Sequence, residues 1–350
     1  MKQKVLCPAA FAAITGSMAL GCGFHTYVPQ PTIVDRLLTS DHIVLARPDP
    51  ADPFRFVAVE ALEGPLADVE LPHLVDSTTR RRFNAEPEAR VLFARDGAYG
   101  PWERLAYVDE DMQRILDDVL ANLPAWGGIG DDRGRYEYFA GLIESNDHRI
   151  QRIALRELDQ ASYQVFRRLP VNPHPETILM RLNNLSEVEL VPIRILLLGL
   201  SDHPDVADFL RAGVDRSTAA GATARLGAFT TAWVEHSGLE AARILAADYL
   251  ADRSLPFESR EMIIEALAIH SEVREPEVAE AVRFAVASAV RAEPELAPAV
   301  ARQFGIRNDW SLSAPVEEVL KRNKLSSVSD IILVSQYVAL ANQADVTRAN

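Results

Sequence analysis

The chain has 350 residues, of which 48% are hydrophobic and 25% are charged. This composition is that of a globular protein and excludes wholesale disorder. Acidic residues outnumber basic residues by 50 to 36, which gives a formal net charge of −14. Because such a surface repels phosphate backbones, bulk electrostatic attraction to nucleic acid is excluded, and we expect no nucleic-acid partner.

Residues 1–21 contain the three parts of an export signal. Lys2 and Lys4 supply the positive start, an apolar run follows, and "ALG" places small residues at the two positions that a signal peptidase reads. The alternative is a transmembrane anchor, which needs about 20 continuous apolar residues. This run is shorter and is interrupted by Pro8. We therefore expect residues 1–21 to be a signal peptide and the protein to be exported.

The chain has two cysteines, and Cys7 lies inside the segment expected to be removed. The exported chain would hold one thiol, so no internal disulfide is expected. The stretch "ALGC" resembles the acceptor site of bacterial lipoproteins, although Ala19 stands where leucine is usual. The resemblance implies a lipid on Cys22 and an anchor on the periplasmic side of the membrane or at the cell surface. The alternative is a free N-terminal thiol.

The region 22–122 is predicted to be a small β-rich domain with one helix near Thr32–Leu38. Its short apolar runs are bounded by Pro, Asp or Gly, and they predict a small antiparallel sheet or barrel. The runs are "DHIVLARP", "FRFVAVEALEG", "ADVELPHLVD", "ARVLFARDG" and "WERLAYVD".

The leading "CGFH", the apolar strand after "LLTSD", and the strands "VEALEGPL" and "VLFARDG" resemble those of netrin-like modules. These modules are small barrels of the oligonucleotide-binding type that begin with a cysteine. They are normally disulfide-bonded, and Cys22 has no partner for such a bond. The resemblance implies the barrel fold, and it assigns no binding residue.

One concentrated basic stretch, "DSTTRRRF", interrupts this acidic region. Arg80, Arg81 and Arg82 are candidate contacts for an anion or for an acidic partner surface. The alternative is a solvated turn between strands, in which Thr78 or Thr79 caps a short helix.

Residues 123–135, "LPAWGGIGDDRGR", contain four glycines and predict a linker or hinge. Beyond it, apolar residues recur at helical spacing through residues 136–343, and residues 344–350 are expected to be a disordered tail. Proline in the first turn marks several helix starts, because its missing amide and fixed φ suit that position. These prolines are Pro175, Pro204, Pro276 and Pro294.

The segment "VELVPIRILLLGL" is apolar nearly all round, which indicates a helix covered on two sides. We expect Gly199 to end this helix with a positive φ.

Three stretches, "YFAGLIESNDHRIQRIALREL", "LVPIRILLLGLSDHPDVADFLRA" and "SREMIIEALAIHS", resemble HEAT-type helical repeats. The resemblance implies that helix pairs stack into an α-solenoid over residues 136–343. The expected fold is therefore α+β with two domains, a small antiparallel β-barrel or sheet followed by the solenoid. The alternative is an irregular helical bundle without true repeats.

None of the eight histidines stands at a helical metal-ligand spacing from another, and the chain has no nucleophile elbow, phosphate loop or dinucleotide fingerprint. We expect no catalytic residue, cofactor or metal. His174 and His203 precede prolines at helix starts, where a cap or turn role is expected. His270 falls near a helix C-terminus, where a partial positive charge is stabilising.

The expected function is that of a non-enzymatic envelope protein, a scaffold whose helical surface binds a protein partner. One alternative is a periplasmic or secreted hydrolase whose acidic and histidine residues meet only in three dimensions. Another is a structural spacer.

Overall fold

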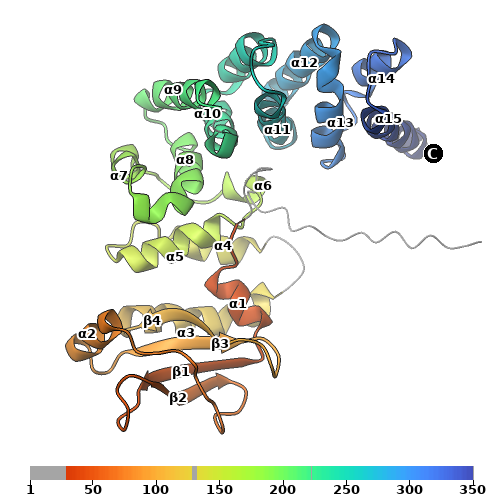
Figure 1. Ribbon diagram of the computed structural model, residues 1–350. Helices are drawn as coiled ribbons and strands as arrows, with labels where there is room; N and C mark the ends of the chain where they lie inside the picture. Colours follow the sequence, from red (N-terminus) through yellow and green to blue (C-terminus); the bar gives the residue numbers. More distant parts are fainter. Residues whose placement is uncertain (1–28, 128–131, 222, 350) are drawn as a thin grey trace, which may run out of the picture.

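The computed structural model describes residues 29–127, 132–221 and 223–349, and Figure 1 shows their arrangement. The expected signal peptide, residues 1–21, and the expected lipid site, Cys22, lie outside the described residues.

The N-terminal region contains a four-stranded antiparallel sheet with the strand order β2-β1-β3-β4. Its strands are β1 (His42–Pro48), β2 (Phe56–Glu63), β3 (Arg90–Arg95) and β4 (Glu103–Val108). The prediction of a strand in "ADVELPHLVD" is wrong, because Leu74 makes only an isolated bridge with Arg55. Asp68 has a positive φ of 61°, and Pro72 has no amide to donate to a ladder, so this stretch cannot continue an extended pairing.

The two central strands are buried on both faces of the sheet. Ile43 and Leu45 belong to the core that continues into the helices. Val44 and Phe93 face the opposite side and pack in a second, smaller core with Phe83 of the helix α2 (Ser77–Ala85). The unbroken apolar runs of β1 and β3 follow from this double burial.

Three helices accompany the sheet: α1 (Ile33–Thr39), α2 (Ser77–Ala85) and α3 (Glu110–Trp126). Helix α1 lies where the sequence predicts it, and its N-cap residue Thr32 forms a capping box with Asp35. Helix α2 is the short helix of the alternative interpretation, but Asp76 caps it rather than a threonine. Helix α3 was not predicted, and it continues into the expected linker as far as Trp126.

The rest of the described chain is helical. Four helices have a proline at or beside their start, as the sequence predicts: Pro175, Pro204, Pro276 and Pro294. Residues 344–349 belong to the last helix, α15 (Val328–Ala349), so the prediction of a disordered tail is wrong for them. Asn350 lies outside the described residues. The elements are α4 (Arg133–Ala140), α5 (His148–Leu158), α6 (Tyr163–Phe166), α7 (Pro175–Arg181), η1 (Leu185–Leu190), α8 (Val191–Gly199), α9 (Asp205–Ala219), α10 (Thr223–Ile244), η2 (Leu245–Leu250), α11 (Phe257–Val273), α12 (Pro276–Ala292), η3 (Pro294–Leu296), α13 (Ala297–Gly305), α14 (Ser313–Lys321) and α15 (Val328–Ala349).

Helices α8 to α15 contact near neighbours in chain order. Helices α8 and α12 both pack against α10, α14 packs against α12, and α13 packs against both α11 and α15. Figure 1 shows these helices following one another along a curved path away from the sheet. Among the described residues, no helix combines the length and the apolarity that crossing a bilayer requires.

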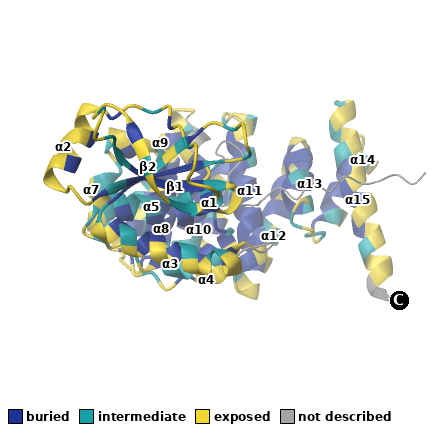
Figure 2. Cartoon of the chain, turned by 90° about the horizontal axis from the view of Figure 1, so that it is seen from below, coloured by how far each residue is buried: buried dark blue, intermediate teal, exposed yellow. Residues whose placement is uncertain are grey.

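A single large core runs from one face of the sheet through the helices to α15, and Figure 2 shows these buried positions in dark blue. A buried polar cluster crosses the junction between α1 and the helices that follow. Arg135 on α4 donates from Nη2 to Thr32 Oγ1 and to Asp35 Oδ1, at 2.8 Å each. Its Nε donates to Glu157 Oε2 on α5 at 3.0 Å, and Glu157 Oε1 accepts from the Val34 amide at 3.2 Å.

Every residue of α8 is buried, as the apolar sequence predicts. The expectation of a positive φ at Gly199 is wrong, because Gly199 is not among the described residues with positive φ. A Cβ atom at this position would lie 2.7 Å from the Cα of Ala232 on α10. Gly199 is therefore required for the close approach of two helices rather than for a turn.

We predict that Gly199→Ala lowers the free energy of unfolding by about 1–3 kcal/mol, because an overpacked contact between buried helices forces the backbone to shift. Gly141→Ala is the matched control, since the nearest atom to its new Cβ would be Tyr138 O at an ordinary 3.4 Å. Chemical denaturation of both variants measures the difference. Equal stability of the two variants would contradict the close-approach explanation.

Candidate functional site

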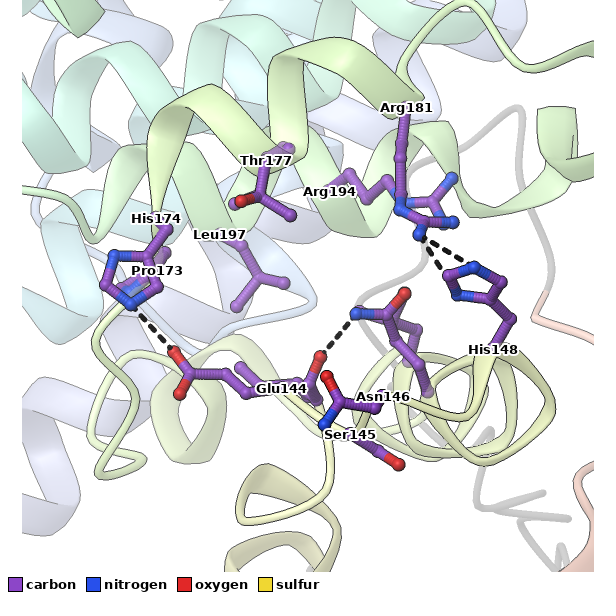
Figure 3. Close-up of a pocket in the computed structure, with 14 residues that line it drawn as sticks. Glu144, Ser145, Asn146, His148, Pro173, His174, Thr177, Arg181, Arg194 and Leu197 are labelled. Carbon is purple, nitrogen blue, oxygen red and sulfur yellow. Dashed lines mark hydrogen bonds and ion pairs between the residues drawn. The ribbon is translucent and has the colours of Figure 1, made fainter.

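A pocket of about 370 Å³ opens between helices α5, α7 and α8. Its wall combines charged side chains at its ends with apolar side chains between them, and Figure 3 shows its lining. The residues that line it are Ile143, Glu144, Ser145, Asn146, His148, Gln151, Leu155, Pro173, His174, Thr177, Ile178, Arg181, Arg194 and Leu197.

Arg194 of α8 is the most unusual residue in this wall, because only 3% of its surface is exposed. Its Nη2 donates to Glu187 Oε2 at 2.6 Å, whereas its buried Nη1 has no hydrogen-bond partner among the described residues. An arginine side chain has five N–H donors and stays charged at any physiological pH. A buried donor without a partner is costly. An anion in the pocket would supply the missing acceptor.

Arg181 of α7 adds a second guanidinium to the same end of the pocket, and Figure 3 shows it beside Arg194 and His148. Its Nη2 lies 3.0 Å from His148 Nδ1, and its Nη1 lies 4.0 Å from Glu187 Oε2. Burial would raise the pKa of Glu187, but the hydrogen bond from Arg194 and the charges of both arginines lower it below its ordinary value. One carboxylate thus serves two guanidinium groups, which leaves this end of the pocket positive.

The opposite end of the pocket holds a histidine beside a carboxylate. His174 Nε2 lies 3.4 Å from Glu144 Oε1, and both side chains are more than half exposed. Figure 3 shows this pair on the far side of the pocket from Arg181. His174 occupies the N-cap position of α7, as expected, but its side chain accepts no capping hydrogen bond. The side chain of His203 does accept from the Asp205 amide at the start of α9, as expected.

Between the two ends, the wall is formed by apolar side chains from α5, α7 and α8. Leu155 is buried within the main core, and Ile178 packs against it. A pocket with a positive end and an apolar body matches a ligand with an anionic head and an apolar side chain.

The three arginines that the sequence singled out lie elsewhere, on the exposed surface of α2. Arg80 stacks over the ring of Phe54 at 4.6 Å, and Arg82 stacks over the ring of Tyr107 at 5.2 Å. Arg81 Nε donates to Ser77 O within the helix. The three side chains contact different groups, and none of them lines the pocket between α5, α7 and α8.

A second ionisable cluster is buried where α6, α10 and α11 meet. Glu235 accepts from Nε and Nη2 of Arg167 at 3.1 Å each and from Arg274 Nη1 at 2.7 Å. His270 Nε2 lies 2.8 Å from Thr231 O, so Nε2 carries the proton, because a carbonyl oxygen can only accept. The other nitrogen, Nδ1, lies 3.9 Å from Glu235 Oε2.

The sequence expectation that His270 carries partial positive charge is wrong. Burial lowers the pKa of His270 to about 4, and the nearby Glu235 carboxylate offsets only part of that effect. The ring is therefore neutral at neutral pH. Because arginines already match the charge of Glu235, this cluster joins helices and offers no free charge to a ligand.

Sequence reasoning missed Arg194, although one signal for it was present. The segment "VPIRILLLGL" holds a single cation inside an otherwise apolar helix, and a lone buried charge needs a partner. Which partner it has, and whether any donor remains free, depends on the fold of η1 and α7. The pocket therefore emerges only in three dimensions.

Comparison with known proteins finds no matching family model, no matching curated protein and no matching solved structure. Within the described residues, no group of three His, Cys, Asp or Glu side chains is placed to hold a metal ion. Functional proposals therefore rest on the geometry of this chain alone.

We predict that His270 makes the protein less stable as the pH falls from about 6.5 to about 4. In this range the unfolded chain binds a proton at the imidazole and the folded chain does not, so acid favours unfolding, by about 3 kcal/mol in full. His270→Gln keeps a donor for Thr231 O and removes the titration. Urea unfolding at a series of pH values measures the effect.

The exposed His203 supplies the control for this experiment. His203→Gln should retain the loss of stability seen in the wild type, whereas His270→Gln should show a shallower dependence on pH. The account of a neutral buried imidazole fails if both variants and the wild type share one pH profile.

Proposed function

We propose that this chain is a non-enzymatic, exported binding protein of the envelope, built as a HEAT-like α-solenoid on a small β-domain and anchored by a lipid on Cys22. Its partner is a protein, and the pocket between α5, α7 and α8 receives a carboxylate group from that partner. The carboxylate is that of a C-terminal residue with an apolar side chain.

The observation that carries this proposal is the unpaired Nη1 of Arg194. Its other terminal nitrogen is paired with Glu187, so the arginine is held in place before a ligand arrives. A carboxylate oxygen bound at Nη1 would form a charge-assisted hydrogen bond in a site sheltered from water, where such bonds are strong. The apolar wall beside it suits a side chain rather than a bare inorganic anion.

The packing of the helices supports the solenoid part of the proposal. Contacts between α8 and α10, α10 and α12, and α12 and α14 repeat at every second helix, as do contacts of α13 with α11 and α15. Helix pairs that stack on their neighbours generate this alternation. An irregular bundle has no reason to repeat it along the chain.

A hydrolase is the second candidate, and the pair formed by His174 and Glu144 favours it. A histidine oriented by a carboxylate beside a pocket is the arrangement of a general base. Ser145 and Thr177 line the same pocket and supply hydroxyl groups. The exposure of His174 and Glu144 supports the binding function instead, because a general base works best where water is excluded.

We predict that acetyl-Gly-Leu with a free carboxylate binds the full chain, whereas its C-terminal amide does not. Arg194→Gln should weaken binding of the free acid about 10-fold to 100-fold, because it removes a charged hydrogen bond. Isothermal titration calorimetry measures both affinities, and circular dichroism reports whether the variant is folded.

Arg168→Gln is the matched control, since it removes an exposed positive charge away from the pocket and should leave binding intact. If Arg194→Gln does not fold, Thr177→Leu fills part of the pocket and provides the second test. Equal affinity for the acid and the amide would contradict carboxylate recognition, as would the absence of binding to the folded wild type.

We predict that hydrolysis of p-nitrophenyl acetate by the wild type equals that by His174→Gln and by Glu144→Gln. Neither residue carries out chemistry in a binding protein, so the stopped-flow rates should agree within error. A rate that falls by more than about tenfold in both variants would favour the hydrolase, because the usual contribution of a general base to the rate is larger than tenfold.

A further inference from the structure

A second pocket, of about 750 Å³, lies far along the chain from the first, at the ends of α12 and α14 and the start of α11. Charged side chains dominate its wall. Five cations face three carboxylates there, in a chain with a net charge of −14. The cations are Arg253, Arg260, Arg291, Arg322 and Lys324, and the carboxylates are Glu293, Glu295 and Glu318.

Arg260 of α11 distinguishes this pocket from an ordinary charged surface. Only 5% of its surface is exposed, and its Nη2 donates to Glu295 Oε1 at 2.6 Å. Its Nε and Nη1 are buried and have no hydrogen-bond partner in the part of the chain that the structure describes. Two donors of a permanently charged group thus lack acceptors, although the group lies in the wall of a pocket.

The remaining charges leave the pocket positive. Arg253 Nε donates to both carboxylate oxygens of Glu293, at 2.7 and 2.8 Å. Glu318 is shared by Arg291, at 3.9 Å, and by Arg322. Lys324 forms no ion pair within the part of the chain that the structure describes. The carboxylates are therefore already engaged, whereas Lys324 and part of Arg260 are not.

We propose that this second pocket binds a phosphate group through Arg260 and Lys324, with Arg291 and Arg322 at its edge. A phosphate presents several acceptor oxygens to one site, and planar guanidinium groups match them in pairs. A carboxylate with two oxygens cannot serve as many donors. The charged wall also suits a small polar anion, in contrast to the partly apolar wall of the pocket that holds Arg194.

The phosphate has two possible sources with the same chemistry, free inorganic phosphate and the headgroup of an anionic phospholipid. The full chain is titrated with sodium phosphate in a calorimeter, at an ionic strength held constant with sodium chloride. In parallel, it is sedimented with vesicles of phosphatidylcholine alone and with vesicles that contain phosphatidylglycerol. Binding in the first arm assigns free phosphate, and binding only to the anionic vesicles assigns the lipid.

In either arm, Arg260→Gln should weaken binding about 10-fold to 100-fold. Lys324→Gln should weaken it several-fold, and less at high salt, because Lys324 is exposed and screened. The Lys324→Gln variant keeps the proposal testable if Arg260→Gln does not fold. Arg225→Gln, which removes an exposed charge elsewhere, should leave binding unchanged.

The proposal is overturned if the folded wild type binds neither phosphate nor anionic vesicles. It is also overturned if binding occurs but Arg260→Gln and Lys324→Gln bind as well as Arg225→Gln, because the anion then contacts a different part of the surface. The outcome is independent of the carboxylate proposal, since the two pockets share no residue.

Discussion

The charge of a buried arginine constrains this structure more than any other feature, because a guanidinium cannot release its proton to escape desolvation. Three arginines of the described chain are buried: Arg135, Arg194 and Arg260. Each must find acceptors for its N–H groups inside the protein or from a ligand. Within residues 29–127, 132–221 and 223–349, Arg135 has no buried nitrogen without a partner, whereas Arg194 has one and Arg260 has two. Arg135, whose buried nitrogens all have partners, lines neither of the two pockets described above. Arg194 lines the first pocket and Arg260 lines the second. This difference is the basis for the binding roles that we propose for Arg194 and Arg260.

Arg135 has a structural role, because the protein itself supplies acceptors for its buried N–H groups. It contacts α1 through Thr32 and Asp35 and contacts α5 through Glu157, whose side chain is fully buried. Burial raises the pKa of Glu157, and the charge of Arg135 opposes that effect. The cluster fixes the helix that precedes the sheet against the helices that follow it, so the sheet and the helical region share one core. Removing one partner from such a pair leaves an unmatched buried charge, which is strongly destabilising. Stability therefore accounts for Arg135 without any ligand.

Local sequence patterns predicted the elements that depend only on a few adjacent residues. The apolar runs of β1 and β3, the helix α1 near Thr32 and the prolines that begin α7 and α12 each follow from the chemistry of a few adjacent residues. Helix α3 was missed, although Met112, Leu116 and Val119 recur at helical spacing. The short apolar runs before it led to the prediction of a β-rich domain over the whole region 22–122. Gly199 was expected to have a positive φ, but it is required because Ala232 of α10 packs closely against it. Ala232 is distant in sequence, so no local pattern indicates this contact. The pocket could not be predicted, because the free donor of Arg194 depends on what η1, α7 and α5 leave unpaired.

Our central proposal is that Arg194 is held ready for an anionic group from outside the chain. A crystal structure of the protein with acetyl-Gly-Leu tests it directly. The account predicts a carboxylate oxygen within about 3 Å of Arg194 Nη1, the usual hydrogen-bond distance, with the leucine side chain against Leu197 and Ile178. A dipeptide bound away from α8, or an Nη1 bonded to a carbonyl oxygen of the protein itself, would contradict it.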